Sequence, residues 1–266
     1  MKAPLTTPME VTVEKMVYKG LGLAHTPRGV LFIPNTYPGD KLSICDIYKK
    51  KGVLYGEVKK VLTPSPFRHT SPCTHFPKCG GCQMIDVRYP DQLTLKTNIV
   101  KDCLGKLPHL IDMIQPIIPS PDVVYYRNKM DYAFGTDTDG QLIIGLKKRG
   151  RFDKVCPIEH CHLQSEASNT IRQFTETFFR EAGETARNPV THEGNCRHLI
   201  IRESKNNAQA MVILVTAKAN TALYQKYGKA LKLAFPEIQS IFHSLNTSQG
   251  DHTFPDKLSL LEGATH

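Results

Sequence analysis

Three cysteines lie within ten residues of one another, at Cys73, Cys79 and Cys82. Their spacing is C-x5-C-x2-C, and Gly80 and Gly81 fill the shorter gap. Thiolates this close repel each other unless a cation binds them, and glycines let the backbone turn tightly and direct N–H groups at sulfur. The segment therefore predicts three of the four ligands of a metal or iron–sulfur centre.

The residues alone leave the fourth ligand open between Cys156 and Cys161. A distant ligand would tie a later part of the chain to the cysteine segment and stabilise the fold. Four cysteines suit either structural zinc or an iron–sulfur cluster, and His75 and His160 are further candidates for zinc. The gap between Cys73 and Cys79 is longer than the gap within the cysteine pairs of zinc knuckles and ribbons, which favours an iron–sulfur cluster. A surface loop without metal is the alternative to both.

Cysteine usage and the absence of apolar segments predict a cytoplasmic protein. The chain has 266 residues and eight cysteines, but no apolar signal region at its start and no run as long as a membrane span. Reduced thiols that cluster are metal ligands more often than disulfides. Cys45 and Cys103 sit in apolar patterns, which predicts small core residues.

The charge of the chain indicates a polyanionic partner. The net charge is +9, and residues 1–67 carry ten Lys/Arg against five Asp/Glu. Nucleic acid is the simplest such partner, and a solvated basic surface is the alternative. The sequence contains no Walker A run. Residues 20–24 precede a strand pattern rather than a helix, so they predict a turn and not a dinucleotide site.

Several short strands must support the cysteine segment. Residues 11–17, 29–34, 41–47 and 54–61 read as short strands separated by Gly and Pro, which predicts a small closed barrel. A helix over 91–107 follows. The helix presents one apolar stripe and stops at Pro108; the stripe comprises Leu93, Val100, Leu104 and Leu107.

The later part of the chain predicts a mixed α/β region. Residues 129–134 and 141–146 flank a polar turn and predict a β-hairpin. Further strands are expected at 198–202, 210–215 and 240–245, and helices at 163–182 and 221–235.

Two basic groups in this region suit RNA. Arg127, Asn128 and Lys129 follow Tyr125 and Tyr126, and such a pair of aromatics can stack on unpaired bases while Lys/Arg bind phosphates. The second group is Lys147, Lys148 and Arg149. An ordinary charged strand edge is the alternative. Arg197, His198 and Arg202 extend the predicted face with weaker support.

In this order, the motifs resemble the S-adenosylmethionine-dependent RNA uracil-C5 methyltransferases that carry a TRAM barrel and a 4Fe–4S cluster. The matching segments are Gly20–Ala24, Val30–Pro34, Pro38–Asp40, Pro64–Arg68, Cys73 to Gln83 with Tyr89, Gln92 and Lys96, Tyr126–Lys129, Ile158–Cys161, Arg197–Glu203, Phe235–Ser240 and Asn246–Ser248. Asp86 stands where the family often has histidine.

The resemblance implies a β-rich α+β fold. It places a small OB-like TRAM β-barrel at 1–66, an iron–sulfur segment and helix at 67–107, and a central mixed α/β RNA-binding domain at 108–266. It favours Cys161 over Cys156 as the fourth cluster ligand. It also implies that Arg127, Asn128 and Lys129 contact RNA, with 23S ribosomal RNA as the expected partner and transfer RNA still open.

The family's catalytic motifs have no counterpart in these 266 residues. We therefore expect the C-terminal methyltransferase domain to be absent, with S-adenosyl-L-methionine bound only if that domain is supplied. Cys196 does not match the family nucleophile. The alternative is a stand-alone RNA-binding iron–sulfur or zinc protein without catalysis. We expect no membrane partner and a monomer, with self-association through the apolar stripe that a missing domain would leave uncovered.

Overall fold

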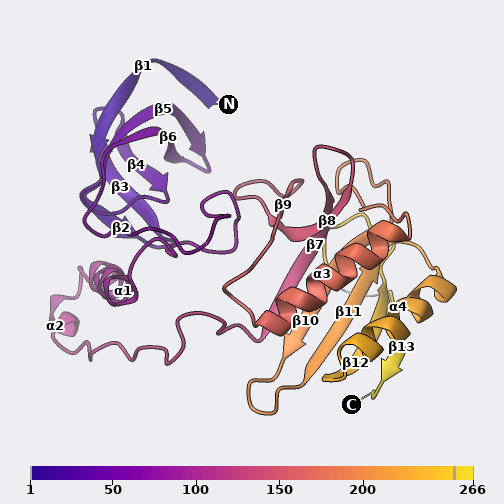
Figure 1. The fold of residues 1–266 in the computed structure, drawn as a ribbon. Coiled ribbons are helices and arrows are strands. Elements are labelled where there is room, and N and C mark those ends of the chain that lie inside the picture. The colour runs from indigo at the N-terminus through magenta and orange to yellow at the C-terminus, as the bar shows by residue number, and fades with distance from the viewer. Residues whose placement is uncertain (1, 254–255, 266) are drawn as a thin grey trace. The chain divides into compact units, whose positions relative to one another are not determined.

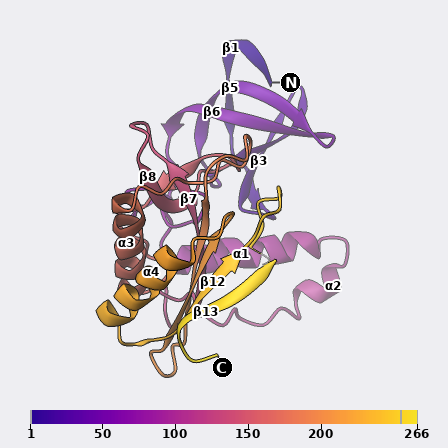
Figure 2. The same cartoon turned by 90° about the vertical axis from the view of Figure 1, so that its right-hand side faces the viewer.

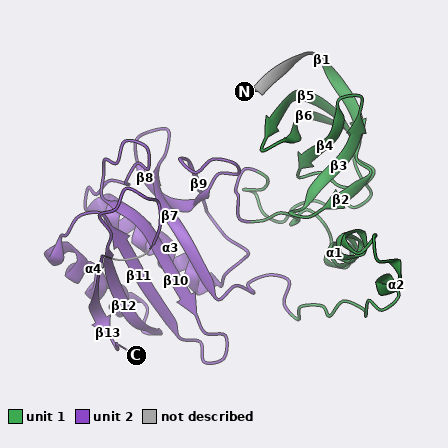
Figure 3. Cartoon of the chain, turned by 180° about the vertical axis from the view of Figure 1, so that it is seen from behind, with its two compact units in different colours: residues 1–77, 82–121 green, residues 78–81, 122–266 purple. Residues whose placement is uncertain are grey.

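The computed structural model describes residues 2–253 and 256–265, with side chains from residue 8 onward. The chain divides into two compact units, which Figure 3 colours separately. Unit 1 comprises residues 1–77 and 82–121, and unit 2 comprises residues 78–81 and 122–266. Each unit is described by itself.

A six-stranded sheet forms most of unit 1. Its strand order is β1-β5-β6-β4-β3-β2, antiparallel except for the parallel pair β4 and β6. The sheet curls into a half-barrel rather than the closed barrel expected from the sequence, since the order ends at β1 and β2 (Figure 1). The strands are β1 (Lys2–Thr12), β2 (Lys15–Val17), β3 (Leu21–Thr26), β4 (Gly29–Pro34), β5 (Lys41–Lys50) and β6 (Val53–Thr63).

The glycine-rich stretch at residues 20–24 is mostly strand, which corrects the predicted turn. The turn is confined to Lys19 and Gly20, both with positive φ, and β3 begins at Leu21. Gly22 lies within β3, at a place where a Cβ would come within 2.1 Å of the Thr36 hydroxyl. Glycine is therefore needed for close packing inside the strand, a role that composition alone does not distinguish from a turn.

Alternating apolar residues of these strands fill one core. Leu31, Ile33, Leu42 and Ile44 are fully buried there. The residues between them, Phe32 and Ser43, point to the opposite face and are only half-buried, as the two-residue period of a strand requires.

Helix α1 (Tyr89–Cys103) packs on a second, smaller core of unit 1. Its buried contact is Leu95, assisted by Ile99, against Met16, Tyr37 and Val87. Two members of the predicted apolar stripe, Val100 and Leu107, are each 48% exposed, which agrees with the expectation that the stripe is uncovered. Leu95, the residue that is buried, was not part of that stripe. The helix also ends before Pro108, which instead begins the short helix α2 (Pro108–Ile111), as proline at a first helical position allows.

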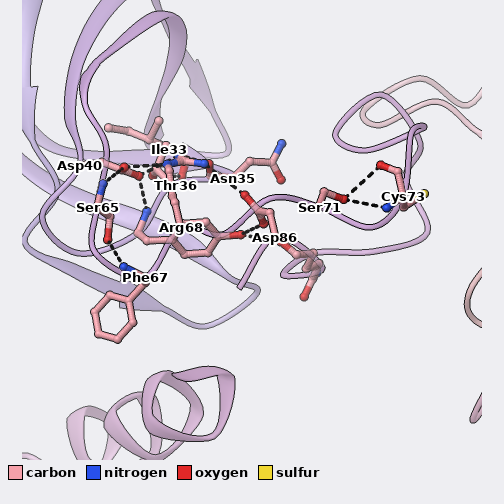
Figure 4. Close-up of polar contacts among 12 residues, drawn as sticks. Ile33, Asn35, Thr36, Asp40, Ser65, Phe67, Arg68, Ser71, Cys73 and Asp86 are labelled. Carbon is pink, nitrogen blue, oxygen red and sulfur yellow. Dashed lines mark hydrogen bonds and ion pairs between the residues drawn. The ribbon is translucent and has the colours of Figure 1, made fainter. Parts of the chain in front are cut away.

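A buried ion-pair network joins the barrel loops to the start of the cysteine segment (Figure 4). Asp40 is fully buried and accepts from Arg68 Nε at 2.7 Å and Nη2 at 2.8 Å. The same carboxylate accepts from the backbone N–H groups of Tyr37 and Ser65. Arg68 also reaches Asp86 at 3.2 Å. Both oxygens of the Asp40 carboxylate thus accept hydrogen bonds, which a buried charge requires.

Asp86, which follows the three cysteines in the sequence, completes this network. Its Oδ1 accepts from the Tyr37 hydroxyl at 2.5 Å. Burial raises the pKa of Asp86, while the Tyr37 hydrogen bond and Arg68 act in the opposite direction. The residue that departs from the family pattern therefore has a structural partner in Tyr37.

A seven-stranded sheet forms the centre of unit 2. Its order is β13-β12-β11-β10-β7-β8-β9, antiparallel except for β11 and β12. The predicted hairpin is confirmed as β7 paired with β8. The strands are β7 (Lys129–Thr136), β8 (Leu142–Lys147), β9 (Val155–Pro157), β10 (Cys196–Glu203), β11 (Ala210–Thr216), β12 (Ile238–Leu245) and β13 (Lys257–Gly263).

Two helices cover one face of this sheet (Figures 1 and 2). Helix α3 (Glu166–Glu181) begins at Ser165, whose hydroxyl accepts from the Ser168 N–H, and α4 (Thr221–Ala234) is the crossover between the parallel strands β11 and β12. Phe179 and Tyr227 pack together beneath them with ring centroids 4.9 Å apart. Mixed sheets in two units establish a β-rich α+β fold. Within the described residues, no helix is long and apolar enough to span a bilayer.

We predict that Arg68→Met destabilises unit 1 by about 3 kcal/mol, because it leaves the buried Asp40 without its counter-charge. Urea unfolding followed by circular dichroism measures the change. Arg88→Met is the matched control: that side chain is 67% exposed and lies 3.9 Å from Asp91, so the expected change is within about 0.5 kcal/mol. Equal effects of the two substitutions would contradict the role given to the network.

Candidate nucleic-acid interface and cysteine segment

The hairpin β7–β8 brings the two predicted basic groups to the same end of the unit 2 sheet. Ala133 faces Gly145, so the antiparallel register places Asp131 opposite Lys147. Lys129 begins β7 at that end, where β8 finishes at Lys147. Segments separated by about twenty residues in the sequence therefore present their charges close together along one edge.

Backbone hydrogen bonds fix the first basic group in place. The Arg127 N–H donates to the Leu163 carbonyl at 2.9 Å, and the Asn128 carbonyl accepts from the Glu203 N–H at 2.8 Å. All three side chains, Arg127, Asn128 and Lys129, are exposed. A rigid backbone with outward side chains is the arrangement that phosphate contacts need.

The two tyrosines that precede this group have different environments. Tyr125 has a φ of 55° and donates its hydroxyl to Glu166 at 2.7 Å, a contact that raises the pKa of Tyr125. Its ring also stacks on His162. Tyr126 is 50% exposed. Of the predicted aromatic pair, Tyr126 is thus the one whose ring is presented for base stacking.

The weaker extension of this face divides into an exposed part and a buried part. Arg202 on β10 is exposed and pairs directly with Lys129 across the sheet. Arg197 and His198 are only 4% and 7% exposed, so their predicted place on the surface was wrong. The reason is that β10 is a central strand, hydrogen-bonded to β7 on one side and β11 on the other.

The second basic group is paired with the cysteine segment. Gly80 N–H donates to the Lys147 carbonyl at 3.0 Å, and Arg149 N–H donates to the Lys78 carbonyl at 2.9 Å. Cys79 and Lys148 form an antiparallel bridge. Residues 78–81 therefore run beside the end of β8 as an added strand.

This close approach explains one of the two glycines. A Cβ at Gly80 would come within 2.9 Å of the Lys147 carbonyl oxygen, which is closer than real Cβ atoms approach. The neighbouring Gly81 N–H donates to Cys79 Sγ at 3.4 Å. The expected direction of an N–H group at sulfur is confirmed at this position.

Cys161 is held by a buried polar environment that the sequence analysis missed. Asn169 accepts from the Cys161 N–H at 2.7 Å and donates to its carbonyl at 3.0 Å. Arg172, 1% exposed, interacts electrostatically with the same cysteine, and burial lowers the pKa of this arginine. Burial also raises the pKa of Tyr132 nearby to about 12. Polar residues on the inward face of the predicted helix 163–182 were the available signal.

The four predicted ligands are divided between the two units. Cys79 and Cys161 are buried in unit 2, whereas Cys73 and Cys82 belong to unit 1 and are partly exposed. Among the described residues, no group of three or more His, Cys, Asp or Glu is arranged to hold a metal ion. Cys156 is also buried, so burial does not separate it from Cys161. The ligand set stays a prediction from spacing and resemblance.

The remaining cysteines have no arrangement for nucleophilic chemistry. Cys196 is fully buried, and burial raises its pKa far above the usual range of a thiol. Cys45 is half-buried and donates to the Glu57 carbonyl. Cys103 ends α1 and is exposed, so its predicted place in a core was wrong.

We predict that iodoacetamide modifies Cys103 in the native protein while Cys196 stays unmodified until the chain unfolds. A thiolate must form and be accessible for alkylation, and Cys196 fails on both counts. Mass spectrometry of tryptic peptides, with and without urea, measures both sites in one sample. Rapid native modification of Cys196 would contradict its burial.

The chain is similar over most of its length to bacterial proteins named as RNA methyltransferases. It is 31% identical to one from Caldanaerobacter subterraneus over 95% of this chain and 57% of the relative. It is 33% identical to one from Thermotoga maritima over 90% of this chain and 53% of the relative. A third, from Bacillus cereus, is 28% identical over the whole chain and 59% of the relative. No family model matches the chain.

A solved structure shares the fold. The tRNA (uracil-54, C5)-methyltransferase of Pyrococcus abyssi, in complex with S-adenosyl-L-homocysteine, superimposes with a TM-score of 0.71 over 94% of this chain. The identity is 23%, and the match covers 55% of that chain. The present chain thus has the fold of part of an RNA methyltransferase, and it spans only a little over half the length of the relatives it matches.

Proposed function

We propose that this chain is the RNA-binding portion of an S-adenosyl-L-methionine-dependent RNA uracil-C5 methyltransferase, with 23S ribosomal RNA as the substrate and the cytoplasm as the location. The observation that carries the proposal is the similarity, over 90% to 100% of the chain, to proteins named RNA methyltransferases. The fold shared with a uracil-C5 enzyme agrees with it.

The exposed end of the β7–β8 hairpin is the surface that we assign to RNA. Arg127, Asn128, Lys129, Lys148 and Arg202 are exposed there. Lys129 forms an ion pair with Asp131, but both side chains remain more than 40% exposed, so the pair is weak and a phosphate can compete for the lysine. Lys147 and Arg149, the remaining predicted contacts, are half-buried.

Methyl transfer itself is assigned outside the matched span. Uracil C5 becomes nucleophilic when a thiolate adds at C6, and a base then removes the C5 proton. The fully buried Cys196 cannot supply that thiolate. We assign the binding of S-adenosyl-L-methionine, which would supply the methyl group, to the part of the relatives beyond the matched residues. The role proposed for this chain is to bind and orient the RNA.

We predict that replacing Arg127, Lys129 and Lys148 together by Gln lowers affinity for a 23S ribosomal RNA fragment at least tenfold. Each residue releases counterions when it meets a phosphate, so the salt dependence of binding should also become shallower. Fluorescence anisotropy at several salt concentrations measures both quantities.

The matched control replaces Lys218, Lys226 and Lys229 by Gln. These lysines are exposed on α4 and the loop before it, and the substitution removes the same charge. An equal loss of affinity in both variants would mean that RNA responds only to net charge, and it would contradict the assigned surface. Absence of RNA binding by the unaltered chain would contradict the proposed function.

We also propose that Cys73, Cys79, Cys82 and Cys161 bind a 4Fe–4S cluster, with zinc as the alternative. Support comes from the spacing, from the Gly81 N–H directed at Cys79 Sγ, and from the clamp of Asn169 on Cys161. Such a centre would organise the cysteine segment beside the basic residues. No step of the proposed function depends on it.

We predict about four irons per chain, with matching sulfide, in protein purified without oxygen. Cys79→Ser and Cys161→Ser should lose the iron and the visible absorption, while Cys103→Ser and Cys156→Ser keep both. One zinc per chain without colour would replace the iron–sulfur centre by a zinc site. Retention of iron by Cys161→Ser, with loss by Cys156→Ser, would reassign the fourth ligand.

A further inference from the structure

A small basic pocket lies in unit 2, apart from the exposed residues assigned to RNA above. Lys147, Arg187 and Arg197 line it together with a single acidic residue, Asp251. Lys147 comes from β8 and Arg197 from β10, whereas Asp251 comes from the loop that joins β12 to β13. Three basic side chains thus line the same pocket as one carboxylate.

The carboxylate of Asp251 lines this pocket and contacts two basic side chains. Its Oδ2 lies 2.9 Å from Lys147 Nζ, and its Oδ1 lies 3.0 Å from His198 Nε2. His198 and Lys147 lower the pKa of Asp251 far below its usual range, although burial opposes them. Asp251 is therefore charged whenever the protein is folded near neutral pH.

Arg197, which lines the pocket, has one donor that the described residues do not use. Its Nη1 donates to the carbonyls of Asn246 and Ser248 at 2.7 Å, and its Nη2 donates to the Gly250 carbonyl. Its Nε is buried and has no hydrogen-bond partner among the described residues. A buried donor without a partner costs folding free energy, and such donors often mark the place of a ligand.

Like charges also meet here without enough counter-charge. Burial lowers the pKa of Arg197, and repulsion from Arg187 lowers it further, while Asp251 and Asp256 act in the opposite direction. The space left beside Asp251 is about 10 Å³, which is close to the volume that a single water needs. The pocket is therefore full while the carboxylate is in it, and an external anion can enter only by taking its place.

Asp251 is able to leave without unfolding the loop. Its side chain is 31% exposed, so rotation carries the carboxylate into solvent. The described residues of this loop are also held without Asp251, by Arg197 at the carbonyls named above and by Asp256, which accepts from the Thr247 N–H at 2.7 Å. A side-chain movement alone would then open the cationic site.

We propose that Lys147, Arg187 and Arg197 form a phosphate-binding subsite whose anion position is held by the Asp251 carboxylate until a phosphate group displaces it. The inference rests on the proposed RNA binding for its biological ligand, a backbone phosphodiester, although a free phosphate has the same recognition chemistry. Asp251 then sets a threshold for binding, because RNA must replace an internal anion to gain this contact.

The test compares Asp251→Asn with the unaltered chain, using inorganic phosphate in calorimetry and a single-stranded RNA oligonucleotide in anisotropy. We expect Asp251→Asn to bind phosphate or RNA about tenfold more tightly, since a competing charge at contact distance is gone. Adding Arg187→Gln should abolish the gain. Glu181→Gln is the matched control, because Glu181 is exposed at the end of α3 and its substitution removes the same charge.

A measurement on the unaltered chain covers the case in which Asp251→Asn fails to fold. Proton NMR of the His198 ring should shift when the ligand displaces Asp251, and His198→Gln identifies the resonance. A gain with RNA only would assign the site to backbone phosphate, and a gain with both ligands would assign it to phosphate groups in general.

Unchanged affinities in a folded Asp251→Asn protein that still binds RNA would overturn the subsite and leave the proposed function standing. An unmoved His198 resonance at saturating RNA would do the same. Tighter phosphate binding by Asp251→Asn in a chain that binds no RNA would uphold the subsite and contradict the proposed function. The two ideas therefore fail separately.

Discussion

The buried carboxylate of Asp40 is the constraint on which the arrangement of unit 1 depends. A fully buried charge is tolerated only when its lone pairs are occupied and a counter-charge is adjacent. Asp40 meets both conditions with groups from three parts of the chain: the Tyr37 backbone, the Ser65 backbone and the Arg68 guanidinium. The barrel loop, the proline-containing linker and the first residues after it are therefore fixed together.

The same guanidinium also contacts a residue that follows the cysteines in the sequence. Arg68 contacts Asp86 at 3.2 Å and lies over the Tyr37 ring at 5.0 Å. Asp86 follows Cys82 in the sequence by only four residues, so both ends of the segment from Arg68 to Asp86 are attached to one site in unit 1. The cysteine segment is a closed loop for this reason, whether or not a metal later joins its thiols. Closing a loop in this way removes much of its entropy before any ligand binds.

The sequence predicted the positions of helices and strands better than it predicted which of their side chains are buried. Apolar periodicity located the β7–β8 hairpin and the helices α3 and α4, because these elements bury regular patterns. In α1 it identified the uncovered apolar stripe but missed Leu95, which alone is buried among many polar residues. A pattern within the helix cannot reveal the partners of Leu95, because they lie outside the helix.

 

These partners of Leu95 are Met16 in β2, Tyr37 in the loop after β4, and Val87 just before the helix.

The candidate site shows the same limit more sharply. Exposed positions such as Arg127 and Lys148 could be selected from local composition, since charge and aromatic neighbours are visible in the sequence. The burial of Arg197 and His198 could not be predicted from local composition, because it depends on the position of β10 in the middle of the sheet. The pairing of His198 with Asp251 joins residues more than fifty positions apart, and neither residue carries a local signal of it.

Net charge therefore overstates how much of this surface is available to a polyanion. The excess of +9 counts every lysine and arginine equally, yet Lys147 is neutralised by Asp251 and Lys129 is partly neutralised by Asp131. Arg127 and Lys148 form no ion pair with any described residue, so they can meet a phosphate without first losing a partner. Binding at the paired lysines is an exchange of one anion for another, and its strength is set by the carboxylate that must leave. Under the proposed RNA binding, this difference would favour particular RNA shapes, because only an RNA that places a phosphate at the occupied positions gains those contacts.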